Sequence, residues 1–235
     1  MEFFKSQLGQ DKYLSEFFLN YKKGYFVEIG AHDGVYLSNT HFFEKHMEWS
    51  GICVEPSKKS SSLLKNRKNS VVINNCIGPK EFNNQIVRFR ENVSMELSET
   101  MFQDLYEEPH YAKELEYEDG QYWDRLNKCI SLDSLLDQNS APSKIDYISI
   151  DTQGSEWLII KDFPLGKWNV KAFSIANDVY QGGQKEENRN KTKFYLQQNG
   201  YKIQKEFSLE ELDKGNWGKD FENKTIEDLY VKQDS

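Results

Sequence analysis

The sequence has few cysteines and no long run of apolar residues. Its three cysteines, Cys53, Cys76 and Cys129, are odd in number and widely spaced, which argues against a disulfide framework and against a cysteine zinc site. No apolar run approaches the roughly 18 residues that a membrane-spanning helix needs. The first residues also lack the basic-then-apolar pattern of a signal peptide. These absences predict buried, reduced thiols and a cytoplasmic protein.

Clusters of basic residues are also missing. The formal net charge is −8, and no group of Lys and Arg offers a face that would neutralise phosphates, so nucleic acid is disfavoured as a substrate. The acidity is local, because residues 91–119 hold ten acidic side chains and one lysine. The rest of the chain is close to charge balance.

Short apolar runs alternate with longer amphipathic stretches, and no internal repeat is present. This rhythm predicts the order strand, helix, strand, helix, strand in the first third of the chain, which is typical of a parallel sheet with right-handed crossovers. The predicted strands are 24–30, 51–55, 71–75, 145–150, 170–175, 201–207 and 228–231, and the predicted helices are 37–47, 57–67, 154–161 and 186–198.

Residues 78–130 interrupt the rhythm. They contain one candidate strand, 86–89, and then the acidic, tyrosine-bearing stretch. We therefore predict one domain over 1–235, with an N-terminal lid helix in 1–20 and an acidic, aromatic insertion in 91–128 over the acceptor side of the sheet.

A glycine turn follows the first predicted strand, in the segment Glu28-Ile29-Gly30-Ala31-His32-Asp33-Gly34. Glycines at this place let the backbone turn sharply and approach a ligand. His32 occupies the place of the middle glycine of a dinucleotide motif, which disfavours a nicotinamide oxidoreductase. Glu55 closes the second strand and could accept both hydroxyls of a ribose, while Glu28 could accept from an ammonium group. The alternative to a ligand-binding site is a purely structural glycine turn beside two solvated carboxylates.

Several ordered segments together resemble the FkbM family of methyltransferases. The segments that carry the resemblance are 6–11 (SQLGQD), 24–34 (GYFVEIGAHDG), 37–40 (LSNT), 49–56 (WSGICVEP), 132–136 (LDSLL) and 145–152 (IDYISIDT). The resemblance implies a three-layer α/β fold with a Rossmann-like class I methyltransferase sheet, mostly parallel with an antiparallel C-terminal strand. It also implies S-adenosylmethionine as methyl donor and O-methylation of sugars, polyketides or related metabolites.

The resemblance implies a set of donor-binding residues along the first three strands. Gln7, Gln10 and Asp11 would form a lid. The others expected near the donor are Glu28, Gly30, Ala31, Asp33, Gly34, Ser38, Asn39, Thr40, Glu55, Pro56, Asn75, Cys76 and Ile77.

The acceptor side departs from the family pattern. The family usually has Asp-Thr-Glu-Gly where this chain has Asp151-Thr152-Gln153-Gly154, and often Glu-His-Asn where this chain has 176–178 (AND). Asp151, Asn177 and Asp178 follow two predicted neighbouring strands, and their oxygens suit Mg²⁺ or another divalent cation, as in catechol O-methyltransferases. The alternative, of equal weight, is a helix cap at Asp151 and a simple turn at 177–178.

Without a metal, Asp151 or His32 is the candidate general base for an acceptor hydroxyl. Aromatic side chains in the insertion are candidates for binding a sugar, although a solvated cover is an equal interpretation of them. These aromatic residues are Tyr106, Tyr111, Tyr122 and Trp123.

The sequence therefore predicts an S-adenosylmethionine-dependent O-methyltransferase for a small-molecule or glycan acceptor, such as a nucleotide-sugar. The main alternative is a donor-binding partner subunit without catalysis of its own. No nucleic acid and no membrane span are expected, and a homodimer or a glycosyltransferase partner is left open.

Overall fold

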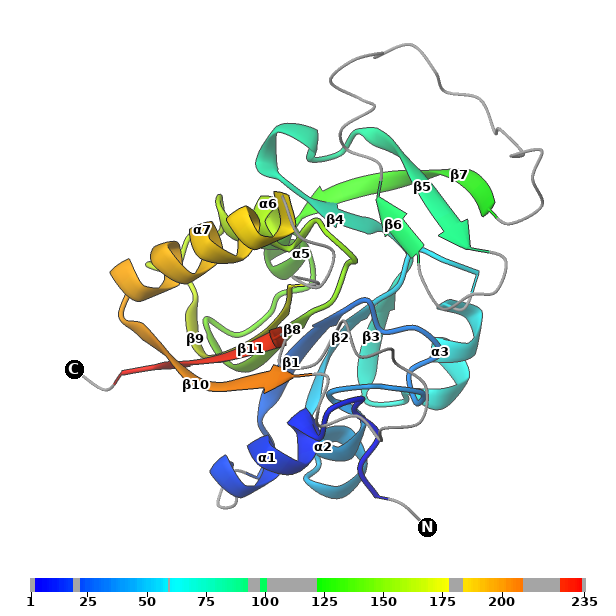
Figure 1. The fold of residues 1–235 in the computed structure, drawn as a ribbon. Coiled ribbons are helices and arrows are strands. Elements are labelled where there is room, and N and C mark those ends of the chain that lie inside the picture. The colour runs from blue at the N-terminus through cyan, green and yellow to red at the C-terminus, as the bar shows by residue number, and fades with distance from the viewer. Residues whose placement is uncertain are drawn as a thin grey trace.

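The fold is taken from a computed structural model that describes residues 3–18, 22–58, 60–92, 98–100, 122–177, 184–208 and 225–233. Its centre is a seven-stranded sheet in the order β10-β11-β9-β8-β1-β2-β3 (Figure 1). The strands of this sheet are β1 (Tyr25–Ile29), β2 (Ser50–Val54), β3 (Ser70–Ile73), β8 (Lys144–Ile150), β9 (Asn169–Ala176), β10 (Tyr201–Ser208) and β11 (Thr225–Lys232).

Five of these strands are parallel, and β11 is antiparallel to both of its neighbours, β9 and β10. Because β1, β2 and β8 are parallel, their carboxyl ends meet at one edge of the sheet. The strand order reverses between β1 and β8. In open α/β sheets this switch point is where ligands bind. Because β11 runs the other way, its first residues join the same edge.

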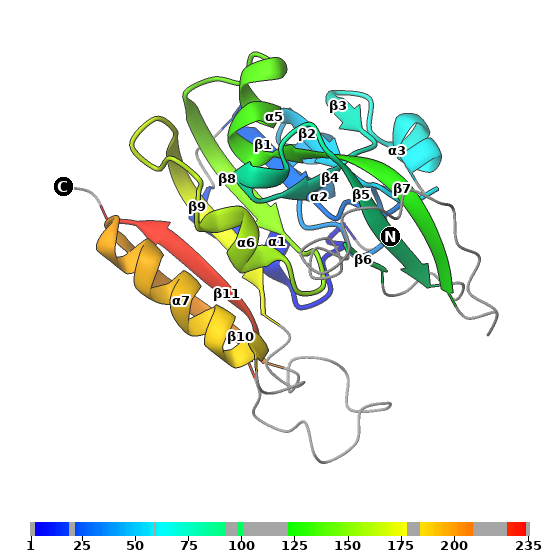
Figure 2. The same cartoon turned by 90° about the horizontal axis from the view of Figure 1, so that it is seen from above.

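Helices cover both faces of the sheet. They are α1 (Gln10–Phe17), α2 (His41–His46), α3 (Ser60–Asn66), α5 (Leu132–Gln138), α6 (Glu156–Ile160), α7 (Gln184–Gln198) and the short 3₁₀ helix η1 (Lys80–Phe82). Leu14, Phe43 and Leu63 of α1, α2 and α3 pack into one buried cluster, and Leu136 and Leu196 of α5 and α7 pack into another. Seen from above, α7 lies along β10 and β11 (Figure 2).

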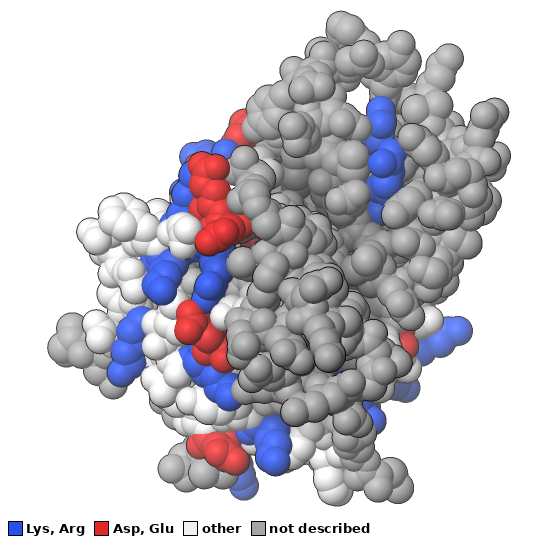
Figure 3. Space-filling view, in the orientation of Figure 1, with Lys and Arg blue, Asp and Glu red and all other residues white. Residues whose placement is uncertain are grey.

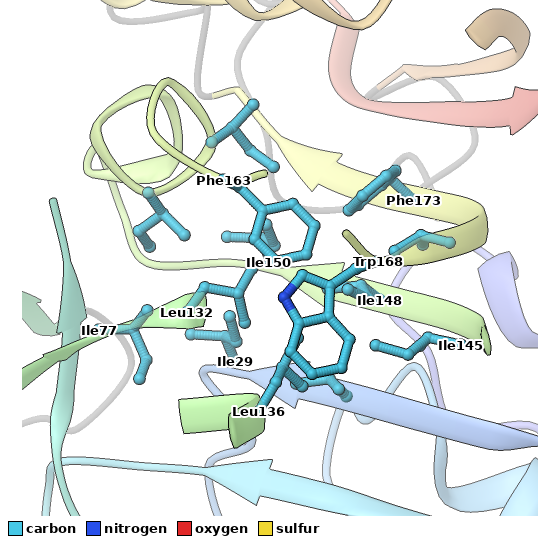
Figure 4. Packing of buried hydrophobic residues seen from close by; sticks show 14 of the residues in the cluster. Ile29, Ile77, Leu132, Leu136, Ile145, Ile148, Ile150, Phe163, Trp168 and Phe173 are labelled. Carbon is cyan, nitrogen blue, oxygen red and sulfur yellow. The ribbon is translucent and has the colours of Figure 1, made fainter. Parts of the chain in front are cut away.

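The second cluster is the larger core. Phe173 of β9 and Tyr230 of β11 belong to it, and Figure 4 shows the Trp168 ring among Leu136, Ile145 and Ile148. Strands β1 and β8 are buried almost throughout, as the near-continuous apolar runs of central parallel strands require.

Residues 76–131 contribute a second, four-stranded sheet in the order β4-β7-β5-β6. Its strands are β4 (Cys76–Gly78), β5 (Ile86–Asn92), β6 (Ser98–Thr100) and β7 (Tyr122–Ser131). The candidate strand at 86–89 is therefore confirmed and is longer than expected. Strands β4, β6 and β7 and helix α5 are not among the elements predicted from the sequence.

The remaining predicted elements match observed ones, with shifted ends. The helix expected from residue 37 begins only at His41, because Leu37 has a positive φ of 56° and Ser38, Asn39 and Thr40 form a turn before it. The thiols of Cys53, Cys76 and Cys129 are free and buried, as predicted. Burial raises the pKa of Cys53 to about 12 and that of Cys129 to about 12, which makes both unreactive.

Basic and acidic side chains alternate on the face shown in Figure 3, with no large patch of one sign among its coloured residues. None of the helices in the described ranges is long and apolar enough to cross a membrane.

Candidate functional site

The carboxyl ends of three neighbouring strands are tied together by backbone hydrogen bonds. Gly30 and Ala31 each donate to the carbonyl of Val54 at 3.0 Å, and Asp151 donates to the carbonyl of Ile29 at 3.0 Å. Gly30 has a φ of +87°, and a Cβ placed on it would lie 2.0 Å from the carbonyl oxygen of Asp151. Glycine is therefore required here, because the backbones after β1 and β8 touch.

Glu55 lies at the same edge, directly after β2. Its carboxylate accepts from the backbone N–H of His32 at 2.8 Å and from that of Ser57 at 2.9 Å, and its pKa is raised by burial. Two backbone donors fix the orientation of the carboxylate and leave lone pairs on both oxygens. A carboxylate held in this way can accept the two hydroxyls of a ribose.

His32 has a left-handed backbone, with a φ of 51°, and this conformation aims its N–H at Glu55. Its Nδ1 lies 3.7 Å from Oδ1 of Asp33, and its ring centroid lies 5.6 Å from that of Tyr36. Asp33 in turn accepts from the backbone N–H groups of Val35 and Tyr36 at 2.9 and 2.8 Å. Both predicted residues thus shape the glycine turn.

Glu28 is the centre of a buried polar network at the end of β1. Its carboxylate accepts from Ser38 Oγ at 2.9 Å, Asn39 N at 2.7 Å, Thr40 Oγ1 at 2.7 Å and Arg67 Nη1 at 3.0 Å. These contacts hold the turn that precedes α2. The expectation that Glu28 faces the donor's ammonium group stays a prediction.

Arg67 connects this network to α2. Its Nε donates to Glu44 Oε2 at 2.7 Å, and its Nη1 donates to the carbonyl of Gly34 at 3.3 Å. The Asn39 amide extends the network to β8 by donating to Ser149 Oγ at 2.9 Å. The segment 38–40 therefore has a fixed shape beside the cradle formed by Gly30 and Glu55.

Three of the residues expected near the donor, Asn75, Cys76 and Ile77, follow β3. Asn75 is half-buried, whereas the side chains of Cys76 and Ile77 are buried in apolar clusters. The carbonyl of Pro56 accepts from the side-chain amide of Asn127 on β7 at 3.0 Å. This contact brings the second sheet against the same edge.

Asp151 and Asn177 follow the neighbouring strands β8 and β9. Asp151 Oδ1 accepts from Gln153 Nε2 at 2.8 Å, and the Asn177 amide donates to Asp228 Oδ2 at 3.3 Å. Asp228 is also bound by Arg189 Nε at 2.7 Å.

The third predicted metal ligand, Asp178, lies outside the described residues. Within the described ranges, no group of three or more His, Cys, Asp or Glu side chains could hold a metal ion. The predicted site of Asp151, Asn177 and Asp178 stays a prediction.

A carboxylate that the sequence analysis missed lies at this edge. Glu227, the third residue of strand β11, pairs in register with Ala176, the last residue of β9. Gln10 of α1 donates from Nε2 to Glu227 Oε2, while its own Oε1 accepts from the backbone N–H of Leu8 at 2.8 Å. Glu227 reaches this edge only because β11 runs antiparallel to β9. In the sequence, the sign that Glu227 could belong to a site is that an acidic residue lies within a strand-like segment.

Burial, with the neighbouring charge of Asp151, raises the pKa of Glu227 to about 8. The side chain is 6% exposed, and its Oε1 has no hydrogen-bond partner. A buried carboxyl group with a raised pKa is thus held at the edge of the sheet where the cradle lies. Titratable groups with such shifts are concentrated at functional sites.

A pocket lies on the other face of the sheet, between α6, α7, the end of β9 and the first half of β11. Gly154, Trp157, Asn177, Arg189 and Tyr230 are among its lining residues. The pocket shares the turn 151–154 with the cradle. An aromatic face beside amide groups is suited to a polar organic ligand.

The other predicted residues have the following places. Gln7 is exposed, and Asp11 is buried and accepts from the backbone N–H of Lys5 at 2.6 Å. Tyr122 and Trp123 form the start of β7, where only the backbone is described. Tyr106 and Tyr111 lie outside the described residues, as does most of the predicted 91–128 insertion.

A comparison with known protein families places this chain in one of them. The family model for the Methyltransferase FkbM domain matches residues 28–203. This range contains the glycine turn, Glu55, Asp151 and Asn177. Comparison with curated proteins finds no match.

Proposed function

The chain belongs to the FkbM methyltransferase family, and on this basis we propose that it is an S-adenosylmethionine-dependent O-methyltransferase for a sugar hydroxyl, on a glycan or a nucleotide-sugar. The matched range covers most of the chain and includes the whole cradle. Methyl transfer is the activity of the family, whereas the donor, the attacked oxygen and the sugar are the parts that we propose.

One observation carries the proposal: Glu55 is held by two backbone N–H groups beside the tight turn at Gly30. Glu55 would hold the ribose, and the backbone at Gly30 and Ala31 would lie along the methionine side. Asn75 would lie beside the adenine. S-adenosylmethionine supplies a methyl group on a positively charged sulfur, so the transfer needs no further activation of the donor.

The acidic network around Glu28 would act by positioning. Ser38, Asn39 and Thr40 are fixed by Glu28 and Arg67 and would form one wall of the donor site. This arrangement gives a preorganised surface, which lowers the entropic cost of binding.

On the acceptor side, the chain must orient a hydroxyl and take its proton, because an aliphatic hydroxyl is a poor nucleophile at neutral pH. Asp151 is our proposed proton acceptor, since its backbone contacts Gly30 of the cradle. Tyr122 and Trp123 on β7 are proposed to contact the sugar.

The proposal is tested first by binding. Calorimetry should show that wild-type protein binds S-adenosylmethionine and S-adenosylhomocysteine and not NAD⁺. Glu55→Ala should weaken both complexes at least ten-fold, because the ribose hydroxyls lose their acceptor. Glu81→Ala is the control, since Glu81 is a surface residue paired with Lys161. Binding of NAD⁺ alone would indicate an oxidoreductase.

Turnover is tested with donor carrying a tritiated methyl group and a panel of nucleotide-sugars and methyl glycosides, with and without a chelator. Transfer of label to a sugar oxygen supports the proposal. Donor binding without transfer to any member of the panel would favour the alternative, a non-catalytic donor-binding partner subunit. Loss of transfer on chelation would show that a divalent cation takes part.

A further inference from the structure

The Gln10–Glu227 contact joins the first helix to the last strand, 217 residues apart. It places a carboxylic acid on the face of the sheet that α1 covers, next to the edge where Gly30 and Asp151 meet. Glu227 interacts electrostatically with Asp151, and the Asp151 backbone touches Gly30. The acid thus lies close to the proposed donor cradle.

Within the described residues, Glu227 has one hydrogen-bond partner, Gln10, and no ion-pair partner. Its Oε1 is buried and unpaired. The side chain is 6% exposed, so water does not compensate for the missing partner. A buried carboxyl group without a counter-charge stays protonated, and it becomes a carboxylate when a cation is brought beside it.

The charged and titratable groups on the surrounding elements are few. Asp151 after β8 and Asp228 on β11 both disfavour the ionised form of Glu227. Tyr147 of β8 interacts electrostatically with Glu227. From β10, Lys205 is directed at the Phe207 ring, with its Nζ 5.1 Å from the ring centroid. The residue of α1 that contacts Glu227 is Gln10, whose side-chain amide is uncharged.

Building on the donor site proposed above, we propose that Glu227 is the residue by which this protein distinguishes the positively charged methyl donor from its neutral, demethylated product. Glu227 loses its proton to solvent when a sulfonium occupies the cradle and regains it when the neutral thioether does. No covalent bond other than the O–H bond of the acid changes in this step.

The direction in which donor affinity changes with pH follows from the protonation state of Glu227 in the ligand-free protein. With a pKa of about 8, Glu227 is mostly protonated at pH 7, and binding of a cation lowers that pKa. Affinity for the donor therefore increases with pH until Glu227 is ionised in the free protein as well. Affinity for the product follows only the groups that donor and product share, so the ratio of the two affinities isolates Glu227.

The experiment is calorimetric titration of the full chain with S-adenosylmethionine and with S-adenosylhomocysteine, from pH 6.5 to 9, in buffers of different ionisation enthalpy. For wild-type protein, the donor-over-product affinity ratio should increase up to about thirty-fold across this range. Donor binding at pH 7.5 should release up to roughly three quarters of a proton, and product binding should release less.

Glu227→Gln keeps the shape and removes the titration, so its affinity ratio should be independent of pH, with no difference in proton release. Glu81→Gln is the matched control and should behave as wild type. Gln10→Leu removes the hydrogen bond that favours the ionised form, so the transition should move to higher pH. This second variant keeps the test valid if Glu227→Gln does not fold.

If donor and product both bind but their affinity ratio does not change with pH, or changes equally in Glu227→Gln, the inference is wrong while the proposed function stands. If neither molecule binds, the proposed function itself is wrong.

Discussion

Arg67, which directly follows α3, donates from Nη1 to Glu28 Oε2 at 3.0 Å, and both side chains are almost completely buried. The same guanidinium donates from Nε to Glu44 Oε2 at 2.7 Å. One cation therefore ties the end of β1 to α2 and α3. Because the partners are removed from water, loss of one of them leaves charge in the interior without compensation.

Arg67→Met should therefore destabilise the protein by about 3–5 kcal/mol, measured as the free energy of unfolding in urea. The methionine replaces most of the volume, so the loss reports the unpaired Glu28 and Glu44 carboxylates. Lys161→Met, which breaks the surface pair with Glu81, is the control and should cost less than about 1 kcal/mol. Equal costs for the two variants would show that the buried network does not hold the turn.

The contact of Gly30 with Asp151 gives a second prediction. Gly30→Ala combines an unfavourable positive φ with a Cβ that would lie 2.0 Å from a backbone oxygen, so the total cost should exceed about 3 kcal/mol. Gly9→Ala is a matched control, because Gly9 has a similar φ of +78° with no atom within 4 Å of the added Cβ. It should cost roughly 1–2 kcal/mol. The free energies of unfolding of both variants, measured in denaturant, separate the cost of the clash with the Asp151 carbonyl from the cost of the positive φ.

The parallel half of the fold could be predicted from local patterns. Strands β1, β2 and β8 are short apolar runs that end in a glycine turn, a Glu-Pro pair or an aspartate, and each pattern lies within about ten residues. The same patterns placed Gly30, Glu55 and Asp151 at one edge. This part of the site follows from the parallel topology alone.

The antiparallel side of the site could not be predicted in the same way. Glu227 reaches the edge only because β11 inserts between β9 and β10, and its partner Gln10 lies at the other end of the chain. The Glu28–Arg67 contact also depends on how α3 packs, which no local spacing reveals. Likewise, β7 was missed because its polar residues pair with β5 in a separate sheet.

Asp151→Asn tests the proposed proton acceptor. The amide is almost the same shape but cannot take a proton, so turnover of a sugar acceptor should fall by about 10²–10⁴. The control is Asp162→Asn, since Asp162 lies exposed after α6. Initial rates with the tritiated donor measure both variants. Unchanged turnover in Asp151→Asn would remove Asp151 from the reaction.

The pH dependence of stability tests Glu227 without any ligand. Its pKa in the folded protein, about 8, lies above its ordinary value of 4.5, so the folded state binds the proton more tightly than the unfolded state. The stabilisation is complete below the ordinary value and is lost as the pH rises to about 8. Within that window, the free energy of unfolding of wild-type protein should decrease relative to that of Glu227→Gln, with a slope approaching about 1.4 kcal/mol per pH unit.

Urea unfolding at pH 5, 6, 7, 8 and 9 measures this difference, with Glu81→Gln as the control that should run parallel to wild type. Other titrating groups contribute equally to both proteins and cancel when the curves are subtracted. A Glu227→Gln curve parallel to wild type would mean that Glu227 is already ionised in the folded protein at neutral pH, and a neutral acid beside the donor cradle would then be excluded.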